Sequence, residues 1–194
     1  AVIVMTTMRS PLWVSTSSTR GIGYMPGGRE SAFGVHRLRG MQKPPKWVIE
    51  EATRAARKAW CAKDSRGVVA WIPGSRTFVS AANGPPVPFK CSGRDDCRAA
   101  CGKLAGHAEE RALWRWADSG YGFRSSVELA HVRVVDNKAV TSGPPSCITC
   151  SRTILMAGIS AIWLWHDDGW RRYEPAEFHT LSLLHEKHRL PVIR

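Results

Sequence analysis

The sequence predicts an α/β domain with three layers, in which helices cover both faces of a mixed sheet of about five strands. The first observation is a pair of strand-like runs, residues 67–73 and 76–82, joined by a turn at Gly74, which is typical of an antiparallel hairpin. The second is a pair of apolar runs, residues 127–135 and 159–165, separated by a helical segment. Strand, helix and strand in this order indicate a crossover with parallel pairing.

Apolar residues at helical spacing predict helices over four segments: residues 46–63, 106–118, 146–157 and 175–188. The third of these helices is expected to be capped by Ser146 and ended by Gly158. Residues 87–105 are expected to form a loop. A fifth strand is expected within residues 170–174, unless the terminal helix takes its place. These elements place one domain over residues 46–194, a length that suits a single ordinary core.

Residues 1–45 are predicted to be a flexible basic extension, because much of this segment is rich in Ser, Thr, Gly and Pro without helical or strand periodicity. Six basic residues and one glutamate give it +5 of the formal net charge of +12. The remaining positive charge suits a phosphate-bearing substrate or a nucleic acid. The sequence contains no apolar run near the ~18 residues of a membrane span, so we expect no membrane partner.

Two short motifs carry the chemistry. His107-Ala108-Glu109 stands at the start of one predicted helix, and Cys147-x-x-Cys150 at the start of another. His107, Cys147 and Cys150 are three ligands of the kind that hold catalytic zinc, with the fourth position left for a water. Glu109 is then placed to move protons as the catalytic acid and base rather than to bind the metal.

These residues resemble the signature of the zinc-dependent cytidine and deoxycytidylate deaminase superfamily. The resemblance rests on His107-Ala108-Glu109 and on the run Pro145 to Cys150, and it covers roughly residues 46–166. In the usual form a proline directly precedes the first cysteine, whereas Ser146 intervenes here. The resemblance implies a cytidine-deaminase-like fold and hydrolytic removal of an amine as ammonia, with one catalytic Zn²⁺ and assembly into a homo-oligomer.

The resemblance also implies three substrate-binding positions: Asn83, Ala108 and Ser146. In the deoxycytidylate branch, an Asn-Gly-Pro-Pro like that at residues 83–86 places its Asn on the substrate sugar. The alternative is an ordinary turn asparagine. The backbone N–H near Ala108 and the carbonyl preceding the first zinc cysteine, at Ser146, would read the edge of the base.

Three more cysteines, Cys91, Cys97 and Cys101, fall within the expected loop. They could bind a second, structural metal if a fourth ligand arrived from elsewhere in the chain. The alternatives are free thiols or a disulfide formed after purification. Six cysteines in a chain of this length do not suggest a secreted disulfide scaffold, and Cys147-x-x-Cys150 favours metal binding in a reducing cytoplasm.

The histidines outside the motif are not expected to bind metal. His131 interrupts a strand, where a histidine usually faces solvent or is hydrogen-bonded in the core. The terminal helix carries three more, which we interpret as surface residues: His179, His185 and His188.

Three functions are consistent with these patterns. The first is a deaminase that converts cytosine to uracil in a free nucleotide or nucleoside, with dCMP favoured by residues 83–86 and by the cysteine-bearing segment. The second is a deaminase acting on a base in single-stranded DNA or RNA, or on a purine or other aminated ring. The third, a non-catalytic zinc-stabilised module, is disfavoured because a structural site normally has a fourth protein ligand.

Overall fold

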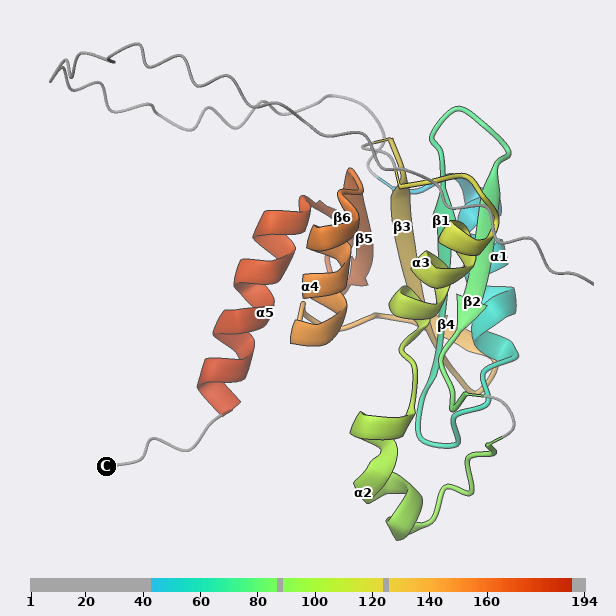
Figure 1. Ribbon diagram of the computed structural model, residues 1–194, viewed down its shortest axis with the longest axis vertical. Helices are drawn as coiled ribbons and strands as arrows, with labels where there is room; N and C mark the ends of the chain where they lie inside the picture. Colours follow the sequence, from blue (N-terminus) through green and yellow to red (C-terminus); the bar gives the residue numbers. More distant parts are fainter. Residues whose placement is uncertain (1–42, 87–88, 124–125, 190–194) are drawn as a thin grey trace, which may run out of the picture. The chain divides into compact units, whose positions relative to one another are not determined.

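The structure, a computed structural model, describes residues 43–86, 89–123 and 126–189. Within them a six-stranded sheet has the order β2-β1-β3-β5-β6, and β4 pairs with β3 outside this path (Figure 1). The strands are β1 Ser65–Trp71, β2 Phe78–Ala82, β3 Glu128–Val135, β4 Lys138–Val140, β5 Ala161–His166 and β6 Gly169–Tyr173. The helices are α1 Lys46–Arg57, α2 Asp95–Leu104, α3 Ala108–Asp118, α4 Ile148–Ala157 and α5 Pro175–Arg189. The extension predicted over residues 1–45 lies, except for residues 43–45, outside the described residues.

The strands pair as the sequence predicts. β1 and β2 form the antiparallel hairpin, with Trp71 opposite Phe78, and β3 is antiparallel to β1 on its other side. β3 and β5 are parallel, with Glu128 opposite Ala161, and α4 precedes β5 in the crossover between them. The expected mixed sheet and the α/β class are therefore confirmed.

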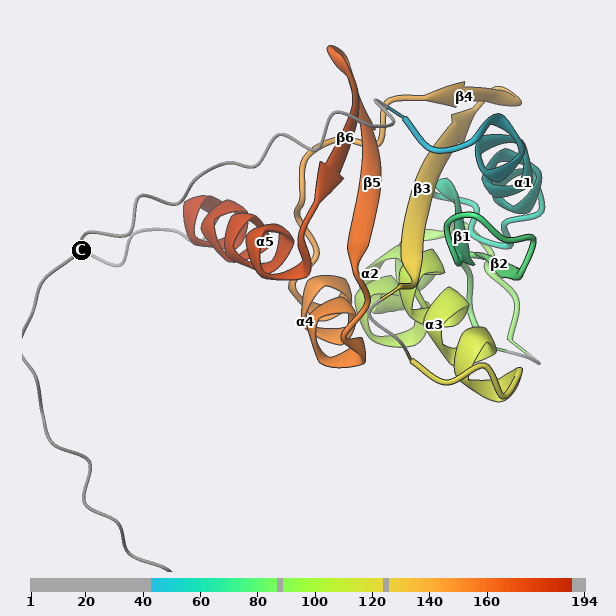
Figure 2. The same cartoon turned by 90° about the horizontal axis from the view of Figure 1, so that it is seen from above.

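Alternate residues of β1 pack against helices on opposite faces of the sheet. Val68 and Ala70 belong to a core cluster that includes Leu113 of α3. Val69 and Trp71 belong to a second cluster that is built with α1. Figure 2 shows the result, with α1 on one side of the sheet and α3 and α4 on the other. A strand buried on both faces reads as a continuous apolar run, which is why this part of the sequence shows no polar alternation.

Two elements do not correspond to predicted ones. α2 lies within residues 87–105, where a loop was expected; Asp95 and Asp96 in its first turn favour a helix electrostatically, but the segment has no apolar stripe that would indicate one. β4 forms a hairpin with β3 through Asp136 and Asn137, whose φ angles of 48° and 62° suit a type I′ turn.

Three further details correct or complete the expectations. The first helix ends at Arg57, several residues before residue 63. The N-cap of α4 is Cys147 rather than Ser146, because the Sγ of Cys147 accepts a hydrogen bond from the backbone N–H of Cys150 at 3.2 Å. The fifth strand is β6, which pairs antiparallel with β5, and the terminal helix follows it instead of replacing it.

Among the described residues, no helix has the length and apolar character needed to cross a membrane.

Candidate active site

The two motifs meet at the starts of α3 and α4. His107 is the N-cap of α3 and Cys147 the N-cap of α4, while Cys150 lies in the first turn of α4. The Nδ1 of His107 lies 3.0 Å from the Sγ of Cys150 and 3.2 Å from the Sγ of Cys147. These three atoms all lie within 4.8 Å of one another, so the chain brings together the three predicted ligands.

The chemistry of these three donors fits zinc. One imidazole nitrogen and two sulfurs form a set that zinc prefers, whereas calcium and magnesium require oxygen ligands. The Cys150 thiol and, next, the imidazole of His107 lower the pKa of Cys147 to about 5, although burial opposes the shift. The contact with the Cys147 sulfur raises the pKa of His107 to about 9. A thiolate is therefore available at Cys147 near neutral pH, as metal binding requires.

Glu109 lies beside this cluster in the first turn of α3. Its side chain is almost fully buried, and its Oε2 is 3.7 Å from the Sγ of Cys150. Burial raises the pKa of Glu109, but His131, the backbone N–H of Glu109, His107 and Arg66 together outweigh burial and lower it. Glu109 is thus an ionised carboxylate at neutral pH, and its Oε2 accepts a hydrogen bond from the thiol of Cys150.

His131 is a pocket residue that the sequence did not reveal. It is 1% exposed, and its Nε2 lies 3.9 Å from Oε1 of Glu109 and 3.4 Å from Nη1 of Arg66. Burial lowers the pKa of His131 to about 4, with Arg66 adding to the effect and Glu109 opposing it. At neutral pH the contact therefore joins a neutral imidazole to a carboxylate. The one available signal was a polar residue interrupting the apolar run of β3.

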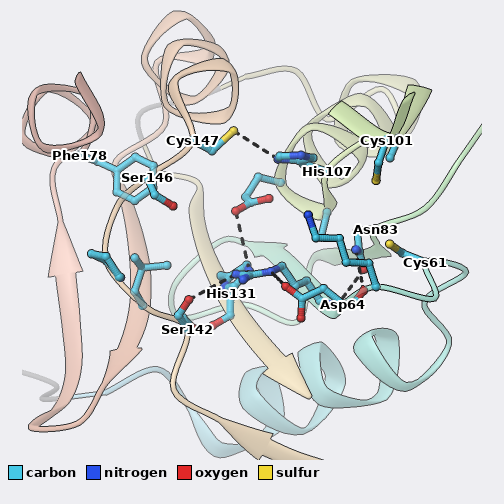
Figure 3. Close-up of a pocket in the computed structure, with 17 residues that line it drawn as sticks. Cys61, Asp64, Asn83, Cys101, His107, His131, Ser142, Ser146, Cys147 and Phe178 are labelled. Atoms are coloured by element: carbon cyan, nitrogen blue, oxygen red, sulfur yellow. Dashed lines mark hydrogen bonds and ion pairs between the residues drawn. The ribbon is translucent and has the colours of Figure 1, made fainter. Parts of the chain in front are cut away.

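Arg66 and Asp64 complete this side of the pocket. Nε of Arg66 donates to Oδ2 of Asp64 at 2.6 Å, and Nη1 donates to the carbonyl of Ser142 at 3.3 Å. Burial raises the pKa of Asp64, but its hydrogen bonds and ion pairs with Arg66 and Arg133 outweigh burial, so the carboxyl is ionised well below its usual range. Figure 3 shows Asp64, His131 and Ser142 below the Cys147–His107 pair.

These groups surround one pocket of about 400 Å³. The substrate-binding positions expected from the resemblance, Asn83, Ala108 and Ser146, all line it. The amide of Asn83 is already engaged with β1, since its Oδ1 accepts from the backbone N–H of Arg66 at 2.9 Å and its Nδ2 donates to the carbonyl of Asp64 at 2.9 Å. Each group of this amide retains one further hydrogen-bonding site for a ligand.

The remaining cysteines form two contacting pairs, one of which lines the pocket. The Sγ atoms of Cys91 and Cys97 are 3.4 Å apart. Cys101 contacts Cys61, which the sequence did not single out, and both line the pocket (Figure 3). Burial and the neighbouring Cys61 thiol raise the pKa of Cys101. Cys61 follows α1 and is distant in sequence, so spacing alone could not connect it with the other three.

Among the described residues, the other histidines do not join the cluster of His107, Cys147 and Cys150. Nδ1 of His179 lies 2.9 Å from Oγ of Ser151, and His185 is partly exposed on α5. The side chain of His188 lies outside the described set.

Solved structures with a similar fold include two cytidine deaminases and a dCMP deaminase. The cytidine deaminase from Burkholderia pseudomallei matches with a TM-score of 0.51 and 16% identity, over 70% of this chain and 96% of that one. The dCMP deaminase from the cyanophage S-TIM5 in apo form matches with a TM-score of 0.44 and 21% identity, over 60% and 77%. The cytidine deaminase from Mycobacterium tuberculosis matches with a TM-score of 0.44 and 21% identity, over 66% and 91%. No model of a known protein family matches the chain, and neither does any curated protein. The first of these matches shows that the chain has the cytidine-deaminase fold.

Proposed function

We propose that this protein is a zinc-dependent hydrolytic deaminase that converts a cytosine-type base to uracil in a free nucleotide or nucleoside and releases ammonia. One observation carries the proposal: the nitrogen of His107 and the sulfurs of Cys147 and Cys150 converge directly beside the buried carboxylate of Glu109. Three ligands with an ionised carboxylate next to them, at the wall of a pocket, suit hydrolysis better than a purely structural metal site.

His107, Cys147 and Cys150 would hold the zinc, which when bound supplies a Lewis acid that makes a water more acidic. Glu109 takes one proton from the attacking water on a carboxylate oxygen and delivers it to the ring nitrogen. It then takes the remaining proton of that same water oxygen and delivers it to the departing amine, which leaves as ammonia. Burial of Glu109 keeps bulk water from competing for these protons. The backbone N–H of Ala108 and the carbonyl at Ser146 are proposed to orient the ring.

Among free substrates we propose dCMP. The run Asn83-Gly84-Pro85-Pro86 supports this choice by its resemblance to the deoxycytidylate branch. Lys63 also lines the pocket, is exposed, and has no ion-pair partner among the described residues. Its ammonium group is therefore free to bind the 5′-phosphate of a nucleotide.

Ammonia release by the zinc-loaded protein tests the proposal. The substrates are dCMP, deoxycytidine, cytidine, adenosine, guanine and a cytosine-containing single-stranded oligonucleotide, each at low and moderate salt. We expect turnover of the monomeric cytosine substrates with little dependence on salt. Turnover of the oligonucleotide alone, lost steeply as salt rises, would replace this proposal with a nucleic-acid deaminase.

We also propose a second, structural zinc held by the four thiols of Cys61, Cys91, Cys97 and Cys101. The two pairs are neighbours, because the Cys91 thiol contributes to raising the pKa of Cys101 and the backbone N–H of Ala62, next to Cys61, donates to the Sγ of Cys91 at 3.2 Å. Figure 1 shows α2 beyond the lower end of α3, apart from the sheet. A metal bound by the four thiols would hold α2 next to the segment that follows α1. Four-cysteine zinc sites stabilise small structural units in this way.

Metal content of two double variants separates the sites. Cys147→Ser/Cys150→Ser should retain about one zinc per chain at the second site, and Cys91→Ser/Cys97→Ser should retain about one at the first. The wild-type protein is expected to carry both. A wild-type chain with a single zinc that disappears in the first double variant would eliminate the second site.

We propose two further properties, the location of the protein and its assembly. All six cysteines are free, which suits the reducing cytoplasm that we propose as the location. Apolar side chains exposed on α4 and α5 support a homo-oligomer: Leu155, Met156, Leu183 and Leu184. Light scattering coupled to size exclusion measures the mass directly, and a mass of 21.5 kDa would show a monomer.

A further inference from the structure

Arg66 is held in place by groups that are themselves fixed. Its guanidinium donates through Nε to Asp64 and through Nη1 to the backbone carbonyl of Ser142. Its backbone N–H is bound by Asn83, which also bonds the carbonyl of Asp64. An arginine fixed at several points loses little conformational entropy when it binds a ligand, so this side chain is preorganised.

Part of this guanidinium remains available to the pocket. Among the described residues no group accepts a hydrogen bond from Nη2, and the side chain, one-third exposed, lines the same pocket as Glu109. A guanidinium in a pocket wall is poorly solvated, and two N–H groups without acceptors favour a ligand that supplies one.

Arg66 and Glu109 border the same part of the pocket. The Nε2 of His131 lies 3.4 Å from Nη1 of Arg66 and 3.9 Å from Oε1 of Glu109. Figure 3 shows His131 lower in the view than His107, on the side of the pocket shared with Asp64 and Ser142. A six-membered ring whose amine-bearing carbon lies at Glu109 would therefore have Arg66 as a neighbour in the pocket.

We propose that Arg66 recognises the substrate ring by donating from Nη2 to the carbonyl oxygen on the ring carbon that one ring nitrogen separates from the amine-bearing carbon. This inference rests on the proposed function and adds a recognition residue to it. A carbonyl oxygen has two lone pairs, so it can accept from Arg66 and from the backbone N–H near Ala108 together. A need for a ring carbonyl oxygen favours cytosine-type rings, which have one. It disfavours adenine, which has none.

A phosphate is a less suitable partner for Arg66 than a ring oxygen. Asp64 already neutralises much of the charge of Arg66 through a 2.6 Å ion pair. Lys63 also lines the pocket and has no such partner in the part of the chain that the structure describes, so it is better suited to a phosphate. The two cations therefore have separable roles, one towards the ring and one towards the phosphate.

The test compares Arg66→Gln, Lys63→Met and Arg133→Gln on deoxycytidine and dCMP, which differ only in the phosphate. Arg66→Gln should lower kcat/KM about 10- to 100-fold for both substrates, the loss of one charge-assisted hydrogen bond. Lys63→Met should lower it for dCMP alone. Arg133→Gln is the matched control, because Arg133 also pairs with Asp64 but does not line the pocket, and both values should stay within about twofold of wild type.

Binding of the products provides a readout independent of turnover. Calorimetry should show that Arg66→Gln weakens the binding of deoxyuridine and the binding of dUMP by similar factors. Zinc content and thermal midpoint should stay at the wild-type values. If Arg66→Gln does not fold, Arg66→Lys replaces it, since lysine keeps the charge but loses the guanidinium geometry.

The inference is overturned if Arg66→Gln affects only dCMP and dUMP, which would make Arg66 a phosphate ligand, or if it affects neither pair. A wild-type protein that deaminates no cytosine substrate contradicts the proposed function separately. In that case the binding of deoxyuridine tests the role of Arg66. If the wild type binds deoxyuridine and Arg66→Gln does not, Arg66 still recognises the ring. If the wild type does not bind deoxyuridine, the inference is wrong.

Discussion

The carboxylate of Glu109 lies 3.7 Å from the sulfur of Cys150, so the proposed proton carrier directly borders a proposed zinc ligand. The two residues come from different helices, α3 and α4, whose first turns meet at the pocket. Each carboxylate oxygen of Glu109 faces a different neighbour, Oε2 towards Cys150 and Oε1 towards His131.

Glu109→Gln removes the proton carrier but keeps the size of the side chain. We expect kcat to fall by about 10²- to 10⁴-fold, the usual effect of general acid–base catalysis. Zinc content and thermal midpoint should stay close to the wild-type values, because Glu109 is not among the three converging donors. Substantial turnover by this variant, measured as ammonia release, would exclude Glu109 as the proton carrier.

His131 should make the folded protein less stable in acid. Its pKa is about 4 in the folded protein and about 6.5 when unfolded, so between these values only the unfolded chain takes up the proton. The free energy of unfolding should therefore fall as the pH drops from about 6.5 towards 4, by on the order of 3 kcal/mol. Above pH 6.5 both states are neutral and the contribution is constant.

Denaturant unfolding of wild type and His131→Gln at a series of pH values measures this contribution. Glutamine is polar and does not titrate, so the difference in slope between the two proteins isolates His131 from the other titrating groups. Equal slopes between pH 4 and 6.5 would show that His131 is not responsible.

Gly67 allows α1 to approach the sheet closely. A Cβ at this position would collide with the backbone carbonyl oxygen of Ala52 and with the backbone nitrogen of Ala56. Neither atom can move without displacing α1, so Gly67→Ala should destabilise the protein by about 3 kcal/mol or more. Gly74→Ala is the control: nothing lies within 4 Å of its Cβ, and only its φ of +80° opposes the change, at a cost of about 1 kcal/mol. Thermal or denaturant unfolding should show this difference.

Glu128 of β3 forms hydrogen bonds with residues of both β5 and β6. It is 6% exposed, and it accepts hydrogen bonds from Nε1 of Trp163 at 2.6 Å and from both Nε and Nη2 of Arg172 at 3.1 and 2.9 Å. Glu128→Ala leaves both partners without an acceptor and should cost about 3 kcal/mol of unfolding free energy. Glu174→Ala removes an exposed carboxylate 3.7 Å from the same arginine and should cost less than about 0.5 kcal/mol. Equal losses in the two variants would contradict this account.

The sequence by itself determined the architecture and the proposed ligands. Turn residues and apolar runs predicted β1, β2, β3 and β5 because hairpin and crossover patterns depend on local chemistry and periodicity, both of which are visible in a linear chain. His107, Cys147 and Cys150 were predicted to share a site because zinc ligation requires particular atoms, and those residue types can be read directly. The structure brings the three donors within 4.8 Å of one another.

Only the tertiary structure decided which other residues reach the pocket. Arg66 precedes the predicted strand at residues 67–73, His131 interrupts the one at residues 127–135, and Cys61 falls near the end of the predicted first helix. None of these local settings indicates a pocket. The residues meet because β1 pairs with β3, with Arg66 opposite Arg133, and because Cys61, which follows α1, contacts Cys101 of α2. Such contacts depend on strand register and on the placement of a helix that has no apolar stripe. Register and helix placement arise from packing between distant segments, which the sequence does not encode locally.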